Sequence, residues 1–311
     1  MARSLPKKKN TREAVGLDLD GSFVAAVRAS GGGIQTAVSE DLPPNVIRDG
    51  EVVDEESLAA ILKDFFRVNE LPKRVRLGVA NQQIVVRQLE LPRIDDERDL
   101  AAAVRFQAAE AIAMPLEETV LDHQVIGETV TPEGAARLRV VVVAAREAMI
   151  SKLVDAVRAA GLRPEGVDLN AFALVRALSG PAASEETARV YCHLGGITNL
   201  AIAVGSACLF TRPLGTAWDA GEDGTAAALA EEIRLSIDYY MAQPEARPAG
   251  EVLLSGPGSA LQDLAEELNQ LIYLPVSAAD PLGGMEGAAL SVDEDPHRHT
   301  VATGLALGAA P

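Results

Sequence analysis

The chain has 311 residues, 48% of them hydrophobic, and a formal net charge of −17 at pH 7. This hydrophobic content excludes general disorder, and the length allows large cores, which we expect to be divided between two lobes. The acidic balance argues against general nucleic-acid binding. The longest apolar runs, 140–145 and 200–210, are shorter than the roughly 20 residues that cross a bilayer.

The first residues are basic, unlike the rest of the chain. The charged side chains are Arg3, Lys7, Lys8, Lys9 and Arg12. Because polar residues follow them rather than an apolar run, they do not resemble a signal peptide, and we expect the protein to stay in the cytosol. We predict that residues 1–14 form a disordered basic arm. Weak contact with anionic lipid or an acidic partner, worth about 1 kcal/mol per charge near a membrane, is the alternative.

Two glycine turns, one in each half of the chain, have the pattern strand–turn–strand. Apolar side chains alternate around Gly21 in residues 15–27, and they do so again around Gly195 and Gly196 in residues 189–204. Because glycine has no Cβ atom, the backbone N–H groups of such turns can face a ligand at close range. Two such hairpins suggest a duplicated α/β fold with a cleft between its halves.

The first lobe is expected to comprise residues 15–80 and 146–180. After the first hairpin, the pattern predicts a third strand at 34–39, a helix capped by Asp54 and a strand at 74–80. Residues 149–160 predict a further helix, 166–169 a short strand, and 171–178 a helix that returns to this lobe.

Between these parts, residues 81–145 predict a separate strand–helix–strand–strand module. Its helix carries a buried stripe that includes Leu100, Val104 and Ala108, whereas Phe106 lies about 200° from Val104 and off this stripe. An exposed Phe106 would suggest contact with a partner, and the alternative is that a neighbouring element covers it.

The second lobe is expected at 189–311, after a small and polar boundary. We predict helices at 226–241, 261–271 and 300–307, a strand at 251–254, and a loose acidic segment at 291–299. Cys192 and Cys208 lie on the two sides of the second hairpin and could be neighbours, but we expect buried, reduced thiols.

Several short segments, in their order and spacing, resemble the PilM family of type IV pilus assembly proteins, relatives of FtsA in the actin-like superfamily. They are residues 48–54, 81–92, 104–107, 114–118 with 121–122, 159–164 and 233–240. The resemblance implies an α/β, actin-like (ribonuclease H-like) two-lobed fold with an SHS2-like subdomain inserted at 81–145 and a reduced second lobe. It also implies a cytoplasmic scaffold at the inner face of the plasma membrane. Its partners would be the cytoplasmic tail of a PilN-like membrane protein and the pilus motor ATPase.

In this family the glycine turns hold the phosphates of a nucleotide. The corresponding residues here are Asp18, Gly21, Ser22, Gly195, Gly196, Thr198, Gly256 and Gly258. Asp20, however, stands where the family has a glycine, and a carboxylate about 4 Å from a phosphate oxygen costs on the order of 4 kcal/mol at an effective dielectric constant of 20. His193 replaces an acid, although Mg²⁺ prefers oxygen ligands.

Two further departures affect the adenosine side of this site. Only residues 211–225 stand where the family has a small subdomain, and Pro257 removes an N–H group from the last contact loop. We therefore expect a degenerate nucleotide site with no catalytic residue, metal or cofactor. The alternative is an ATP-binding protein with slow ATPase activity that uses ATP and Mg²⁺.

The resemblance places the partner's tail in a groove between the inserted module and residues 15–80. The polar candidates are Asn81, Gln82, Gln83 and Arg87, with Phe106 as a further contact. Ile84 and Leu89 can supply apolar contacts. The alternative is that these side chains only cap and fill the module.

Overall fold

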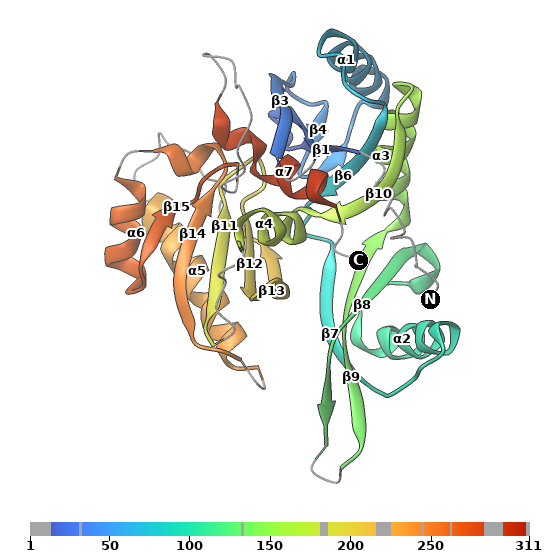
Figure 1. Ribbon diagram of the computed structural model, residues 1–311, viewed down its shortest axis with the longest axis vertical. Helices are drawn as coiled ribbons and strands as arrows, with labels where there is room; N and C mark the ends of the chain where they lie inside the picture. Colours follow the sequence, from blue (N-terminus) through green and yellow to red (C-terminus); the bar gives the residue numbers. More distant parts are fainter. Residues whose placement is uncertain are drawn as a thin grey trace, which may run out of the picture.

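A computed structural model describes residues 14–30, 33–131, 134–180, 186–215, 225–243, 246–261, 263–282 and 295–308 (Figure 1). Two five-stranded sheets form the two lobes, and a three-stranded sheet projects from the first lobe. The predicted basic arm lies outside the described residues, apart from Ala14. None of the helices in the described part of the chain combines the length and the apolar character that a membrane span needs.

The two large sheets have the same topology, which confirms the predicted duplication. In the first sheet, of order β10-β6-β1-β2-β3, the hairpin strands are antiparallel, and β6 and β10 run parallel to β1. In the second, β13-β12-β11-β14-β15, the same senses recur. The strands of the first sheet are β1 (Val15–Leu19), β2 (Phe23–Ser30), β3 (Gly33–Asp41), β6 (Arg74–Val79) and β10 (Arg163–Leu169). Those of the second are β11 (Ala188–His193), β12 (Asn199–Val204), β13 (Ala207–Pro213), β14 (Ala249–Ser255) and β15 (Val276–Ala278).

Each sheet buries one face under two helices. On the first sheet these are α1 (Glu55–Val68), which Asp54 caps by accepting a hydrogen bond from the Ser57 amide, and α3 (Glu147–Ala159). On the second they are α5 (Thr225–Met241) and α6 (Leu264–Ile272). A short hairpin, β4 (Ile47–Arg48) and β5 (Glu51–Val52), adds to the first lobe.

The inner faces of both sheets are covered by two helices that pack against each other, α4 (Asn170–Leu178) and α7 (Thr300–Leu307) (Figure 1). α4 contacts both lobes, because Ala171 and Val175 lie against the second sheet while Phe172 also packs against the core of the first lobe. The expectation that α7 belongs to the second lobe is wrong in its packing, because Ala302 packs on the first sheet. Both helices are apolar on more than one side, so their sequences do not predict which of the two sheets each helix packs against.

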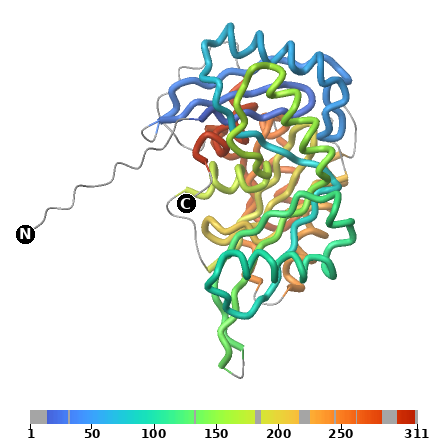
Figure 2. The backbone as a smooth tube through the Cα atoms, turned by 90° about the vertical axis from the view of Figure 1, so that its right-hand side faces the viewer, coloured from blue at the N-terminus to red at the C-terminus, as the bar shows by residue number. Residues whose placement is uncertain are grey.

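The inserted module has the predicted order of strand, helix, strand and strand. Its elements are β7 (Val85–Pro92), α2 (Glu97–Ala111), η1 (Leu116–Glu118), β8 (Thr119–Val130) and β9 (Ala136–Arg146). The sheet order is β7-β9-β8, and its core joins Leu91, Val104 and Ala108 to Val140 and Val142. The paired ends of β8 and β9 extend beyond the rest of the fold in Figures 1 and 2.

Some details of the second lobe differ from expectation. The helix expected at 261–271 begins only at Leu264, after a 3-10 turn, η2 (Pro257–Ala260). Part of the segment expected to be loose forms another, η3 (Pro296–His299). The thiols of Cys192 and Cys208 belong to cores on opposite faces of the second sheet, so they are not neighbours. Between the end of β13 at Pro213 and the start of α5 at Thr225 the chain has only residues 214–224.

Candidate functional site

The two predicted glycine turns face each other between the lobes. Residues 20–22 connect β1 to β2, and residues 194–198 connect β11 to β12. The backbone amide of Gly196 lies 2.8 Å from each carboxylate oxygen of Asp20 and donates its hydrogen bond to that carboxylate. Asp20, which departs from the family pattern in the first turn, therefore accepts a hydrogen bond from the second turn.

The glycines of the second turn allow this close approach. A Cβ atom on Gly195 would lie 2.2 Å from Oδ2 of Asp20, and one on Gly196 would lie 2.3 Å from the backbone oxygen of Asp20. Real Cβ atoms do not come so close to such atoms. The Asp20 side chain therefore lies directly against the backbone of the second turn.

The charge of Asp20 is partly compensated. Burial raises the pKa of Asp20, while the hydrogen bonds from Gly196 and Ser22 and the positive charge of Arg298 act in the opposite direction. The hydroxyl of Ser22 donates to Oδ1 of Asp20 at 3.0 Å. Gly21 between them has a φ of 110°, a conformation that suits glycine.

Asp18 lies beneath this turn and is buried. Burial, reinforced by the neighbouring charge of Asp20, raises the pKa of Asp18 well above its ordinary value. Nδ2 of Asn170 lies 3.4 Å from Oδ1 of Asp18. Oδ2 of Asp18 and Oδ1 of Asn170 have no hydrogen-bond partner among the described residues. A protonated Asp18 carries a donor for such an acceptor, so the surroundings favour the neutral acid.

His193 is buried below the second turn. Its Nδ1 lies 3.1 Å from Oγ of Ser255, and burial lowers the pKa of the imidazole to about 4, so the ring is neutral at pH 7. A Cβ on Gly195 would lie 3.0 Å from Nε2, and one on Gly256 would lie 2.9 Å from Cε1. The ring thus fills the space between two glycine loops, as an ordinary residue at the end of a strand can do.

The third loop, which contains Gly256 and Gly258, also forms hydrogen bonds within the protein. The amide of Gly258 donates to the carbonyl of Leu194 at 3.1 Å, and Gly256 has a φ of 82°. Oγ of Ser259 lies 3.1 Å from Nδ1 of His297 in η3. Thr198 is buried, and its backbone carbonyl accepts a hydrogen bond from the Leu214 amide. The predicted nucleotide residues therefore lie on neighbouring loops, but two of their amides, those of Gly196 and Gly258, donate hydrogen bonds within the protein itself.

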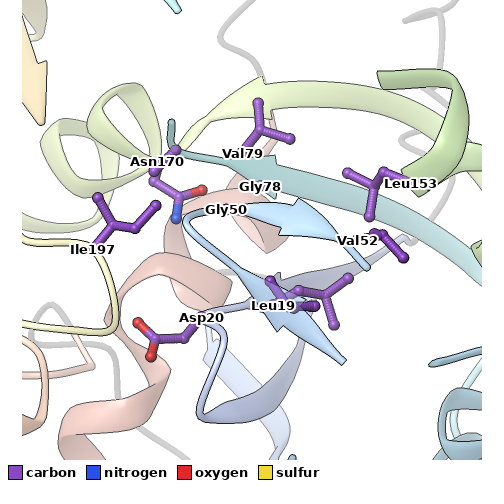
Figure 3. A pocket seen from close by; sticks show the side chains of 11 residues that line it. Leu19, Asp20, Gly50, Val52, Gly78, Val79, Leu153, Asn170 and Ile197 are labelled. Atoms are coloured by element: carbon purple, nitrogen blue, oxygen red, sulfur yellow. The ribbon is translucent and has the colours of Figure 1, made fainter. Parts of the chain in front are cut away.

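A cavity of about 20 Å³, with room for about one water molecule, lies beside Asp20 and Asn170 (Figure 3). Ile197 closes one side of it from the second lobe, and a Cβ on Gly50 would lie 2.8 Å from Cδ1 of Ile197. Figure 3 shows the Asp20 carboxylate directed away from Leu19, toward the loop that carries Ile197. Sequence reasoning missed Ile197, although an apolar residue directly after a glycine turn was a usable signal.

The predicted partner residues fall into two groups. Asn81 is buried, and its side chain donates to the carbonyl of Asp49 at 2.7 Å and accepts from the amide of Gln83 at 2.7 Å. It therefore holds the junction of the module, as the alternative interpretation expects, and is not available as a contact. Gln82, Gln83 and Arg87 are exposed.

A second small cavity lies at this junction. It is lined by the first lobe, by the start of the module, including Ile84 and Val86, and by Asn199 and Thr211 of the second lobe. Gln88 of β7 spans the same region, because its side-chain amide donates to the carbonyl of Leu209 in β13 at 2.6 Å. Sequence reasoning did not anticipate this contact between the module and the second lobe.

Phe106 is 73% exposed on α2, which confirms the prediction that it lies off the buried stripe. Its role as a partner contact stays a prediction. Among the described residues, no three His, Cys, Asp or Glu side chains are placed to share a metal ion.

Comparison with solved structures identifies the fold. A PilM–PilN type IV pilus biogenesis complex superposes with a TM-score of 0.82 at 23% identity, covering 95% of this chain and 98% of that chain. MreB5 of Spiroplasma citri bound to ADP gives 0.54 at 11% identity and covers 96% of each chain. The cytoplasmic domain of EpsL from the type II secretion system of Vibrio cholerae gives 0.52 at 12% identity, with 95% and 94% coverage. The fold is therefore actin-like.

The family is shown by sequence. The model of the family described as type IV pilus assembly protein PilM matches residues 16–188, which is more than half of the chain. This match spans the first lobe and the whole inserted module, and it ends where the second lobe begins. The chain belongs to the PilM family of type IV pilus assembly proteins.

Proposed function

We propose that this protein is a non-catalytic adaptor of type IV pilus assembly whose nucleotide site has been lost. The observation that carries the proposal is the hydrogen bond between the Asp20 carboxylate and the amide of Gly196, in the turn that the family uses for phosphates. A phosphate would have to displace this carboxylate and would then lie beside its negative charge.

The surroundings of Asp20 support the same conclusion. Asp18 is biased toward its neutral form and His193 is a neutral imidazole, so neither is suited to hold hydrated Mg²⁺. A nucleotide with Mg²⁺ therefore does not fit these residues as they are arranged.

An ATP-binding protein with slow ATPase activity is the second candidate, favoured by the retained Asp18, Gly21 and Ser22. Calorimetric titration of the full chain with ATP and Mg²⁺ distinguishes the two. We expect no tight binding, and a single Asp20→Gly substitution should not restore it, because the adenosine side also departs from the family pattern. A dissociation constant in the low micromolar range for the wild-type protein would favour the second candidate.

We further propose that the partner is the cytoplasmic tail of a PilN-like membrane protein, which would hold the adaptor at the inner face of the plasma membrane, with the pilus motor ATPase as a further contact. PilN is named with PilM in the complex that superposes best among those compared above. The tail would lie along the exposed Gln82, Gln83 and Arg87, next to the junction cavity with Ile84 and Val86. We expect these exposed polar side chains to fix the register of a peptide, and Ile84 and Val86 to supply apolar contacts beside them.

The peptide site is tested by binding a synthetic peptide of the tail of the PilN-like protein from the same pilus system. The double variant Gln83→Ala with Arg87→Ala should weaken binding at least tenfold, or about 1.4 kcal/mol, without a change in melting temperature. A matched control changes Gln124 and Arg98, which are exposed elsewhere on the module. Equal binding by both double variants would reject this location.

A further inference from the structure

We infer that Asp20 and Ile197 form a latch between the lobes, in which the chain's own carboxylate takes the place of a phosphate as the ligand of the second glycine turn and holds the cleft closed. The inference rests on the proposed function in one respect, since it assumes that no nucleotide occupies this turn. It adds a mechanism by which the protein keeps one arrangement of its lobes without a ligand.

The polar half of the latch joins residues that are far apart in sequence. The Gly196 amide is 2.8 Å from both oxygens of Asp20, and the two residues are 176 positions apart. The carboxylate is held in place on the first lobe by the hydroxyl of Ser22 and by the Asp20 amide, which donates to the carbonyl of Phe23 at 3.1 Å. A charged acceptor positioned in this way makes a stronger hydrogen bond than a neutral one.

The apolar part of the latch is a residue of the second lobe that contacts the first lobe. Ile197 of the second-lobe turn forms one wall of the cavity that Leu19, Ile47 and Val52 of the first lobe also line. Gly50 makes room for it, because a Cβ there would lie 2.8 Å from Ile197 and 2.0 Å from the carbonyl oxygen of Ala80. Each lobe thus contributes one side chain to the contact, Asp20 from the first lobe and Ile197 from the second.

A third contact crosses the cleft beside this pair. Arg298 in η3 forms an ion pair with Asp41 at 2.7 Å and lies 5.0 Å from the ring centroid of Phe23, both on the first lobe. The preceding His297 contacts Ser259 of the second lobe at 3.1 Å. Consecutive residues of η3 therefore contact different lobes, and, against the effect of burial, the positive charge of Arg298 lowers the pKa of Asp20.

The latch has a consequence for the junction cavity, which is lined by all three parts of the molecule. Because both lobes contribute to its walls, its shape depends on the angle between them. A tethered carboxylate is always present at the turn, unlike a ligand whose occupancy follows its concentration. The surface for a peptide is therefore formed in advance.

The test measures the distance between the lobes in the full chain. Spin labels on cysteines introduced at Lys63 in α1 and Glu267 in α6 report this distance, and both positions are exposed. In the wild-type background we expect one narrow distribution, because the latch fixes the lobes. Asp20→Ala combined with Ile197→Ala should broaden it and raise hydrogen exchange at the Gly196 amide more than tenfold. Asp122→Ala, an exposed acid on the module, is the control and should change neither measurement.

If the double variant does not fold, Asp20→Ala alone provides the test, because it removes the acceptor of the Gly196 hydrogen bond. A folded variant with the wild-type distance distribution and exchange rate would overturn the latch. Millimolar inorganic phosphate should restore protection of the Gly196 amide in Asp20→Ala, and failure to do so would overturn the claim that the carboxylate takes a phosphate's place. Tight ATP binding by the wild-type protein would instead reject the proposed function and leave the distance measurement valid.

Discussion

At the scale of single residues, the cleft contains acids and an imidazole that the protein keeps close to neutrality or internally paired. Asp18 is the clearest case, because it is buried with one carboxylate oxygen that has no partner among the described residues. His193 is buried as the neutral ring. The surroundings of both residues disfavour the charged form of the side chain.

The titration of Asp18 leads to a prediction about stability. Its pKa is raised above the ordinary value of 3.8, so the stability that the neutral group contributes is complete below pH 3.8 and is lost as pH rises through the folded-state pKa. Asn cannot lose a proton, so Asp18→Asn should be more stable than the wild type at pH 7, by on the order of 1–3 kcal/mol. Chemical denaturation at several pH values measures this, and the advantage should shrink toward pH 4. A wild-type protein more stable at pH 7 would contradict it.

At the scale of elements, α2 separates a buried stripe from an exposed aromatic residue. Val104 is fully buried in the core of the module, whereas Phe106 is 73% exposed. The spacing of apolar residues along the helix is sufficient to predict that Val104 is buried and that Phe106 lies off the buried stripe.

Alanine substitution on α2 should therefore separate stability from binding. Val104→Ala leaves a cavity in the module and should cost roughly 1–3 kcal/mol, whereas Phe106→Ala should change stability by less than about 0.5 kcal/mol. Thermal denaturation measures both. If Phe106 is a partner contact, its alanine variant also loses affinity for the tail peptide at an unchanged melting temperature, and unchanged affinity would remove it from the site.

At the scale of the whole molecule, the crossing of α4 and α7 connects the cores of the two lobes. α4 lies on the second sheet and α7 on the first, and they meet at Gly304, where a Cβ would lie 1.9 Å from the carbonyl oxygen of Ala173. Such an approach leaves no room for a side chain.

Gly304→Ala should therefore destabilise both lobes together, by about 2 kcal/mol or more, because the helices must move apart. Probes placed in either lobe should report the same lowered transition temperature. Gly166→Ala is the control, since no atom lies within 4 Å of a Cβ there. A loss of stability confined to one lobe would show that the crossing does not couple them.

The sequence by itself determined the local elements, the duplication and the inserted module. Strand alternation around two glycine turns, the Asp54 cap and the 3-4 spacing of α2 depend on neighbours in the chain, and the structure confirms each of them. The predicted nucleotide residues also meet at one cleft, because both turns lie at the same end of equivalent hairpins. Asp20 was recognised as a departure from the family, but only as a charge that repels phosphate.

Contacts between residues far apart in the sequence were visible only in the tertiary structure. Asp20 accepts a hydrogen bond from Gly196, Ile197 lies against Gly50, and Gln88 donates to Leu209 in β13, and in each pair the residues are more than a hundred positions apart. The tertiary structure also placed α7 on the first sheet and brought α4 into contact with both sheets, and it paired the Asn81 side chain with the Asp49 carbonyl. The physical reason is that periodicity reports which side of an element is buried, whereas the identity of the covering element depends on how the lobes come together.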